Sequence, residues 1–209
     1  MVYTAEYASP LGMITLACDG EAITGLWFNA QKHFGSILPR ETLRQEHPLF
    51  AKARRWLDIY FSGREPGFLP PLRYDSTPFR KLVCDILLTI PYGETMTYGE
   101  IAAETARRQG VKTMSAQAVG GAVAHNPISL MIPCHRVVGA GGSLTGYVGG
   151  IDRKVSLLAL EHKARQSERE KPGTGQRAPG RREPYITHKP PGFSLKSARE
   201  AFFFSVGMI

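Results

Sequence analysis

Residues 115–138 read SAQAVGGAVAHNPISLMIPCHRVV, and this stretch decides how the rest of the chain is interpreted. Ser115 is a favoured N-cap residue, and the small residues that follow it predict a short helix. Asn126-Pro127 ends that helix, because a proline disfavours the helical conformation in the residue before it. A short apolar run then leads into Pro133-Cys134-His135-Arg136. The stretch therefore predicts a helix of small residues followed by a turn that carries a cysteine.

The glycine pair Gly120-Gly121 lies inside this predicted helix, where each glycine costs roughly 1 kcal/mol relative to alanine. Upstream, Thr97 and Glu100 form a capping box that starts another helix, and a polar loop containing Gly110 joins the two helices. This arrangement suggests a helix-turn-helix. The glycines then have two explanations: close approach of the backbone to a narrow surface such as the DNA minor groove, or tight helix packing within the domain.

The N-terminal part has a different pattern. Three alternating segments joined by Pro/Gly and Asp-Gly turns predict a β-meander, and a helix with apolar residues at three- and four-residue spacing follows His47-Pro48. Four prolines between residues 66 and 78 indicate a linker, and the last helix is predicted from Ile151 to about Ala164. We therefore predict an α/β (α+β) chain of four parts: a sheet domain with a helix at 1–68, a Pro-rich linker at 69–78, a mostly helical domain at 79–165, and a basic tail at 166–209 that we expect to be disordered.

Composition narrows the choice of partner and compartment. The formal net charge of +8 favours a polyanionic partner such as nucleic acid, although part of the excess lies at 163–182. No apolar run reaches the roughly 18 to 20 residues that span a bilayer, and the N-terminus lacks the features of a secretory signal. The three cysteines are odd in number and far apart, which argues against disulfides and a structural zinc site. We expect a cytoplasmic protein with reduced cysteines and no membrane partner.

Cys134 is the candidate nucleophile. A lone cysteine is most often a small buried core residue, which is how we interpret Cys84. Cys134 differs because His135 is adjacent, and a histidine in a positive field favours the thiolate. Adjacent side chains in an extended chain point apart, so the pair needs a turn or a bridging water. Glu161, on the last predicted helix, is a candidate for fixing the histidine tautomer.

Residues 132–137, which read IPCHRV, resemble the active-site signature of the O6-alkylguanine-DNA alkyltransferases, also called methylated-DNA–protein-cysteine methyltransferases. The resemblance covers residues 77–164, where AVGGA at 118–122, TGYVGG at 145–150 and LLALE at 157–161 keep the family's order and spacing. The N-terminal strands and helix fit the family more loosely. The resemblance implies an RNase H-like first domain and a winged-helix-like second domain that contains the helix-turn-helix.

The resemblance also implies a reaction. An alkyl group is expected to pass from O6-methylguanine in DNA to the sulfur of Cys134, with O4-methylthymine a second candidate substrate. The transfer is irreversible and occurs once per molecule, and it needs no cofactor and no metal. The expected partner is double-stranded DNA, bound through the minor groove by a monomer, with the alkylated base flipped out of the stack.

Five residues are expected to carry the chemistry if the family's roles transfer. Cys134 would be the acceptor thiolate, activated through a water by His135, which Glu161 orients. Asn126 would tie the recognition helix to the active-site turn. Tyr98 would donate a hydrogen bond to N3 of the guanine, which stabilises the charge on the departing base.

The resemblance assigns further residues to the base pocket and to DNA. The carbonyls of Cys134 and Val137 would accept from the exocyclic amine of the guanine, the amide of Val148 would lie near O6, and Arg136 would support the site structurally or electrostatically. The full set of expected substrate and DNA contacts is Ser115, Gln117, Ala118, Gly121, Arg136, Val137, Tyr147, Val148, Gly149 and Lys154.

Two positions depart from the family pattern. Gln117 stands where several members have an arginine that fills the hole left by the flipped base, and glutamine brings no charge to that role. Val148 stands in place of a serine, which matters little if only the backbone amide is used.

The residues leave two other function classes open. A damage-binding protein on the same scaffold would flip bases without any transfer, but such proteins replace the cysteine that is present here. A Cys–His hydrolase would need an oxyanion hole, and none is identifiable in the sequence.

Overall fold

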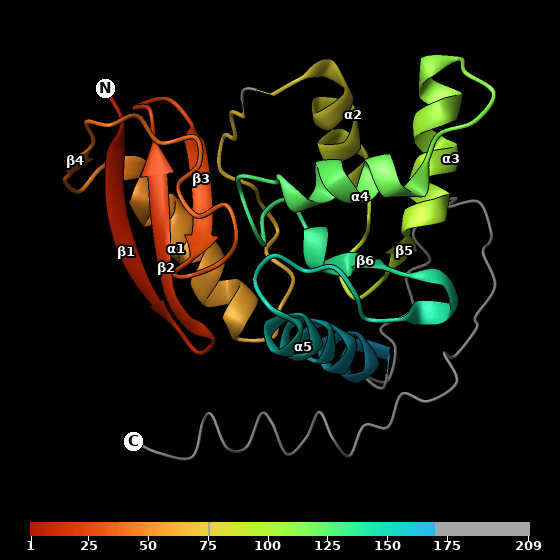
Figure 1. Cartoon of the computed structure of the whole chain (residues 1–209). Helices are drawn as coiled ribbons and strands as arrows, with labels where there is room; N and C mark the ends of the chain where they lie inside the picture. Colours follow the sequence, from red (N-terminus) through yellow and green to blue (C-terminus); the bar gives the residue numbers. More distant parts are fainter. Residues whose placement is uncertain (75, 170–209) are drawn as a thin grey trace.

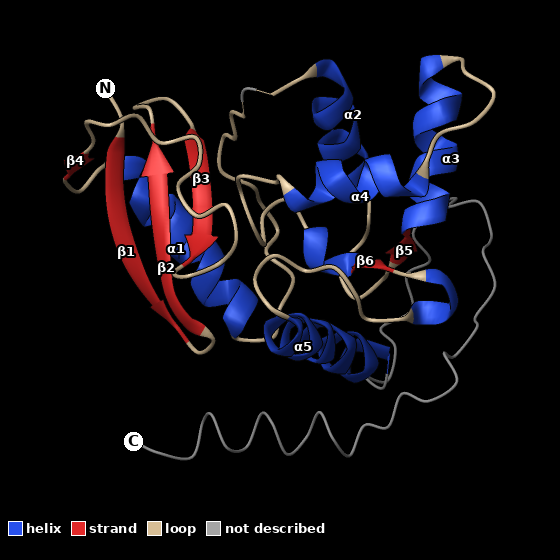
Figure 2. Cartoon of the chain, in the orientation of Figure 1, coloured by secondary structure: helices blue, strands red, loops and turns tan. Residues whose placement is uncertain are grey.

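The computed structural model describes residues 1–74 and 76–169, whose elements form a sheet with one helix and a second group made mostly of helices (Figures 1 and 2). The predicted α/β class is confirmed. In chain order the elements are β1 (Tyr3–Ser9), β2 (Gly12–Cys18), β3 (Ile23–Phe28), β4 (Leu43–Arg44), α1 (Pro48–Phe61), α2 (Pro78–Leu87), β5 (Met96–Thr97), α3 (Tyr98–Gln109), α4 (Ala116–Ala124), the 3-10 turn η1 (Cys134–Arg136), β6 (Val137–Val138), the 3-10 turn η2 (Ala140–Gly142) and α5 (Ile151–Arg169).

The N-terminal sheet has the strand order β3-β2-β1-β4. The first three strands are antiparallel neighbours, so the predicted β-meander is confirmed. The sequence did not predict β4, a strand of two residues that pairs in parallel with β1 through Tyr3 and Leu43. A strand this short carries no period-2 pattern from which it could be recognised.

Helix α1 lies against one face of this sheet (Figure 1). The imidazole of His47 caps it by accepting from the amide of Leu49, and Pro48 occupies the first turn, where its missing N–H costs nothing. The helix buries the apolar face that the sequence predicted, with Leu49, Phe50, Ala53, Trp56, Leu57 and Tyr60 inside. This face brings the end of α1, including Tyr60, to the later helices.

The helices of the second group begin at the predicted caps. Thr77 caps α2, and Thr97 and Glu100 make both bonds of the predicted capping box at α3. Ser115 caps α4 by accepting from the amide of Ala118. Each side-chain oxygen satisfies an amide that the first turn of a helix leaves without a partner, which explains why these boundaries were readable from the sequence.

Strand β3 ties the second group to the sheet. The amide of Leu26 donates to the carbonyl of Pro127 at 3.0 Å, and the amide of Ser129 donates back to Leu26 at 2.9 Å. The segment predicted as a linker pairs with the same strand, because the amide of Ile23 donates to the carbonyl of Pro71 and the amide of Arg73 donates to the carbonyl of Ile23. The residues that precede the cysteine turn are thereby anchored to the sheet.

Helix α5 begins at Ile151 as predicted but continues to Arg169, five residues beyond the predicted end near Ala164. Residues 170–209, which hold most of the predicted disordered tail, lie outside the described residues. Within 1–74 and 76–169, no helix combines the length and apolar character needed to cross a bilayer.

Candidate active site

The cysteine turn is held from one side by Asn126. Its side-chain amide donates to the carbonyl of Ile132 at 2.8 Å and to the sulfur of Cys134 at 3.1 Å, while its oxygen accepts from the amide of Ile128 at 3.0 Å. Cys134 begins the turn η1 and is 2% exposed. Asn126 therefore links the segment just after α4 to the thiol.

The thiol of Cys134 experiences opposing influences. Burial raises the pKa of the thiol above its usual value, and the bond from Asn126, nearby backbone amides and the charge of Lys154 offset only part of that rise. The Nζ atom of Lys154 is buried and donates to the carbonyl of Thr145 at 2.9 Å, and this lysine has no ion pair within the described part of the chain. Burial lowers the pKa of Lys154 to about 8, although Cys134 works against that shift. The site thus offers a buried amide donor and a buried cation to a thiolate.

His135 and Glu161 form a fully buried pair. The distance from His135 Nε2 to Glu161 Oε1 is 2.7 Å, and both side chains are 0% exposed. His135 Nδ1 has no hydrogen-bond partner among the described residues. Because a carboxylate only accepts, Nε2 carries the proton and Nδ1 keeps a lone pair that can take one. Burial lowers the pKa of His135, although Glu161 opposes this, so the ring is held neutral.

Glu161 collects further donors. Arg136 binds it with two nitrogens, Nε to Oε2 at 2.9 Å and Nη2 to Oε1 at 3.1 Å, and the amide of Gly93 donates to Oε2 at 2.9 Å. Burial works to raise the pKa of Glu161, but His135 and Arg136 outweigh it and lower the value to about 2. Arg136 also donates to the carbonyl of Ile90 at 2.7 Å. The carboxylate is therefore ionised, and Arg136 contacts it directly.

The sequence did not assign Tyr60 to the site. This residue of α1 donates from its hydroxyl to Glu161 Oε1 at 2.8 Å and lies 3.2 Å from His135 Nε2. Its position in the apolar stripe of α1 predicts a core residue, and its ring is indeed completely buried. The sequence offers one weak signal, because a buried tyrosine hydroxyl needs a hydrogen-bond partner.

Tyr98 and the loop 144–149 cover another side of the site. The Tyr98 hydroxyl donates to the carbonyl of Gly146 at 3.2 Å, and burial raises the pKa of Tyr98, which keeps it a donor. The ring of Tyr147 is buried, and its hydroxyl has no hydrogen-bond partner among the described residues. A Cβ on Gly149 would lie 2.5 Å from that ring, so only glycine fits there. Val137, in β6, donates its amide to the carbonyl of Cys134 and pairs with Met96.

A loop of the N-terminal part contacts two elements near the site. The amide of Lys32 donates to the carbonyl of Val148 at 3.2 Å, and the ring of His33 stacks on His125 with the centroids 4.3 Å apart. His125 is the C-cap residue of α4. The loop therefore touches both the C-terminal end of α4 and the loop that carries Val148.

The outer face of α4 consists of Ser115, Ala116, Gln117, Ala118 and Gly121, all exposed. A Cβ on Gly121 would meet no atom within 4 Å, so packing does not require this glycine. The packing explanation of the pair is therefore wrong for Gly121. At Gly120 a Cβ would lie at an ordinary 3.8 Å from the ring of Tyr98. The exposed face therefore carries only small side chains beside Gln117 and has open space at Gly121.

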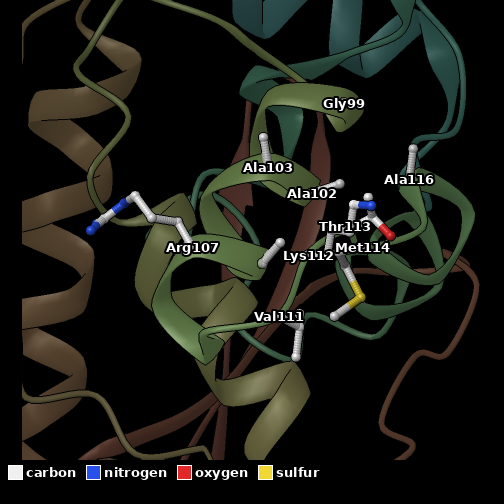
Figure 3. Close-up of a pocket in the computed structure, with 10 residues that line it drawn as sticks. Gly99, Ala102, Ala103, Arg107, Val111, Lys112, Thr113, Met114 and Ala116 are labelled. Atoms are coloured by element: carbon white, nitrogen blue, oxygen red, sulfur yellow. The ribbon is translucent and has the colours of Figure 1, made fainter.

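A surface pocket of about 400 Å³ lies between α3 and the segment that leads into α4 (Figure 3). Its lining residues are Gly99, Ala102, Ala103, Ala106, Arg107, Val111, Lys112, Thr113, Met114 and Ala116. None of them belongs to the hydrogen-bonded cluster around Cys134 and Glu161, so the pocket lies beside the candidate site. In the part of the chain that the structure describes, no group of three His, Cys, Asp or Glu side chains could hold a metal ion.

The structure brings one group of the predicted residues together around the thiol and the carboxylate, and this group consists of Asn126, Cys134, His135, Arg136, Lys154 and Glu161. The residues Ser115, Gln117, Ala118 and Gly121 lie apart from it on the exposed face of α4. Cys84 is buried in the core of α2, as expected, and burial raises its pKa to about 12.

Both parts of the chain match known proteins of one family. The family model for the 6-O-methylguanine DNA methyltransferase ribonuclease-like domain matches residues 2–74, and that for the DNA binding domain matches residues 78–163. A methylated-DNA–protein-cysteine methyltransferase of Mycobacterium leprae is 42% identical over 161 residues, which is 77% of this chain and 93% of the relative. One from Methanosarcina acetivorans is 41% identical over 160 residues, 77% of this chain and 98% of the relative.

Solved structures agree with these matches. The Mycobacterium tuberculosis OGT crystal structure in complex with DNA has a TM-score of 0.69 and 40% sequence identity, covering 78% of this chain and 94% of that one. The predicted family, the ribonuclease-like N-terminal fold and the methyltransferase class of enzyme are confirmed. The chain belongs to the 6-O-methylguanine DNA methyltransferase family.

Proposed function

We propose that this chain repairs alkylated DNA by direct reversal, moving the alkyl group of O6-methylguanine onto the sulfur of Cys134. The observation that carries the proposal is the environment of that thiol. A buried amide of Asn126 donates to the sulfur at 3.1 Å, the buried cation of Lys154 favours its ionised form, and His135 offers an unprotonated Nδ1. Together these groups favour a thiolate nucleophile.

The proposed reaction is a displacement at carbon. The thiol proton of Cys134 passes through a water to Nδ1 of His135, and the sulfur forms a bond to the alkyl carbon while the bond from that carbon to O6 breaks. The departing guanine takes the electron pair. The hydroxyl of Tyr98 donates to N3, and the amide of Val148 donates toward O6, so the developing charge is stabilised. The product thioether is stable, so each molecule acts once, without cofactor or metal.

Substrate entry requires one exchange of hydrogen bonds. The Tyr98 hydroxyl donates to the carbonyl of Gly146 before any base is present. In the proposed complex it donates to guanine N3 instead, while the carbonyls of Cys134 and Val137 accept from the exocyclic amine. The ring of Tyr147 and the backbone from Tyr147 to Gly149 form the wall of this base pocket.

The proposed partner is double-stranded DNA, approached from the minor groove by a monomer with the alkylated base flipped out. The outer face of α4 supports this proposal, because the open space at Gly121 lets the backbone come close to the duplex. Gln117 takes the place of the intercalating residue, and Ser115 and Ala118 flank it on the exposed face. The Mycobacterium tuberculosis relative was crystallised with DNA, which agrees with a DNA partner here.

We further propose that the chain works as two domains, at 1–68 and 79–165, in the cytoplasm. Three unpaired cysteines are consistent with a reducing compartment.

The test uses a duplex that carries one O6-methylguanine with a labelled methyl group. Label should move to the protein once per molecule, should map to Cys134, and should be lost in Cys134→Ala but retained in Cys84→Ala, the matched control for a buried thiol. Binding without transfer would instead support a damage-binding protein, and repeated turnover on an ester or peptide would support a hydrolase. A second duplex with O4-methylthymine decides whether that base is a substrate.

A further inference from the structure

We propose that Tyr60, from the N-terminal helix α1, is a positioning residue for the alkyl transfer, because its hydroxyl holds His135 in the tautomer that can accept the proton of Cys134. The inference rests on the proposed function for its role in transfer, but its structural part concerns the unreacted protein alone. It assigns to the N-terminal part of the chain a direct share in the active site.

The geometry places the hydroxyl between the two members of the acid–base pair. Tyr60 donates to Glu161 Oε1 at 2.8 Å, and the same hydroxyl oxygen lies 3.2 Å from His135 Nε2. His135 Nε2 lies 2.7 Å from that same carboxylate oxygen. Since the hydroxyl proton is committed to the carboxylate, the hydroxyl oxygen presents a lone pair to Nε2. Two acceptors therefore face Nε2, and both favour a proton there.

The ring of Tyr60 has little freedom to move away. It is completely buried and stacks on Trp56 with centroids 5.2 Å apart and planes inclined by 8°. The rings of Phe61 and Tyr92 pack against it edge to face, at 5.4 and 6.0 Å. Burial and the adjacent Glu161 hold the pKa of Tyr60 well above its usual value, so the hydroxyl remains a donor throughout the neutral range.

The hydroxyl of Tyr60 also reduces the negative charge on the carboxylate of Glu161. Each hydrogen bond to Glu161 Oε1 withdraws negative charge from the oxygen that faces His135. Removing the Tyr60 hydroxyl leaves this oxygen with the donors from His135 and Arg136 alone, which makes it a stronger attractor for a positive imidazolium. His135 should then become protonated at a higher pH, and a protonated ring cannot take the thiol proton. A purely space-filling tyrosine would predict no such shift.

The experiment compares Tyr60→Phe with Tyr7→Phe. The control removes a hydroxyl that donates to Asp58 of the same helix at 2.8 Å, but at the surface and away from His135. The single-turnover transfer rate is measured against pH, and the tautomer of His135 is read from ¹⁵N NMR of the unreacted protein. For Tyr60→Phe the acid limb of the rate profile should move up by roughly 0.5 to 1 pH unit, which corresponds to a three- to tenfold slower transfer on that limb. The ¹⁵N shifts should show the neutral Nε2–H form giving way to the imidazolium at a correspondingly higher pH.

An unchanged rate profile in Tyr60→Phe, or a rate shift that the ¹⁵N titration of His135 does not share, overturns the proposal. If the phenylalanine variant does not fold, 3-fluorotyrosine placed at position 60 keeps the packing and makes the hydroxyl a stronger donor. The acid limb should then move down, and no movement or an upward movement overturns the proposal. Failure of the wild-type protein to accept any label refutes the proposed function instead, and the NMR result still decides the role of Tyr60.

Discussion

The side-chain amide of Asn126 donates to the sulfur of Cys134 across 3.1 Å, from a residue just beyond the C-cap of α4 to the residue that begins the turn η1. The same nitrogen donates to the carbonyl of Ile132, so the amide orients the backbone and the sulfur together. An N–H donor stabilises a thiolate more than a thiol, because the hydrogen bond to a charged acceptor is stronger. In the proposed reaction, the residue that couples α4 to the turn thus also stabilises the nucleophile.

Replacing Asn126 by Ala should therefore slow transfer and weaken the fold. Loss of the donor raises the pKa of Cys134, and each unit reduces the thiolate fraction about tenfold, so a roughly tenfold slower transfer at neutral pH is expected. The carbonyl of Ile132 and the amide of Ile128 lose partners, which should cost about 2 kcal/mol of unfolding free energy. Both are measured in a background with Cys18 and Cys84 changed to Ala, by iodoacetamide reaction against pH and by urea unfolding. A variant that reacts as fast as its parent would contradict the assignment.

Lys154→Met should stabilise the protein while slowing the reaction. A buried ammonium without a carboxylate is costly, and methionine fills similar space without the charge. At the same time the thiolate loses its nearest cation, so transfer at neutral pH should fall roughly tenfold if the pKa of Cys134 rises by about one unit. Calorimetry and single-turnover assays are the measurements. Slower transfer combined with lower stability would point to a merely structural lysine.

The same lysine should leave a signature in the pH dependence of stability. Its pKa is lowered from 10.5 to about 8 in the folded protein, so between these values the unfolded chain binds more protons. The unfolding free energy of the parent, relative to Lys154→Met, should therefore rise as the pH increases from about 8 to about 10.5. Using Cys134→Ala as the parent removes the titration of the thiol. If the difference in unfolding free energy stays constant across this pH range, the pKa of Lys154 is not lowered in the folded protein.

Glu161→Gln should destabilise the protein strongly, because Arg136 would be left as a buried cation without its anion. Breaking a buried pair in this way costs about 3–5 kcal/mol. The folded pKa of Glu161 is lowered from 4.5 to about 2, so its contribution is present above 4.5 and is lost as the pH falls toward 2. Urea unfolding against pH measures this. Glu104→Gln is the control, since the ion pairs of Glu104 with Arg107 and Arg108 lie at the surface and should be worth about 1 kcal/mol or less.

Gly121→Ala separates the contribution of α4 to the stability of the free protein from its proposed contact with DNA. Because the added Cβ meets no atom within 4 Å, the free protein should gain about 1 kcal/mol from helix propensity. Affinity for duplex DNA should fall several-fold, because the methyl group keeps the backbone from the groove. Thermal unfolding and fluorescence anisotropy with a labelled duplex report the two effects. Gly67→Ala, in an equally open place outside any helix, should leave DNA affinity unchanged, and unchanged affinity in Gly121→Ala would remove α4 from the interface.

Gln117→Arg tests the intercalating role. An arginine at this exposed position adds a charge that can contact phosphate, so DNA affinity should increase and the slope of log affinity against log salt should steepen by about one. Gln45→Arg adds the same charge at an exposed position of the N-terminal part and should leave the slope as it is. Equal effects of the two substitutions would mean that only net charge matters.

The elements that the sequence predicted well are those set by neighbouring residues. The capping box of Thr97 and Glu100 and the cap at Ser115 depend on residues three apart, and the structure has both. The end of α5 was missed because no glycine or proline stops the helix near Ala164, and it continues to Arg169.

The candidate site was less accessible to such reasoning. Cys134 and His135 are neighbours, so their pairing with a distant carboxylate could be suggested, but the flipped guanine came only from family resemblance. Tyr60 was missed because its partner Glu161 lies 101 positions away, and periodicity places it simply on the buried face of α1. A tyrosine whose hydroxyl contacts a site and a tyrosine that only fills a core occupy the same kind of position in the helical repeat.

The carboxylate of Glu161 also constrains how this chain can evolve. Its donors come from α1, from the segment at Gly93 and from the turn η1. A change at Tyr60, Arg136 or Glu161 alone strands a buried polar group, so tolerated changes at these three positions should occur together and epistatically. Libraries that vary one of them at a time should yield few functional sequences, and libraries that vary all three should recover combinations that no single step reaches.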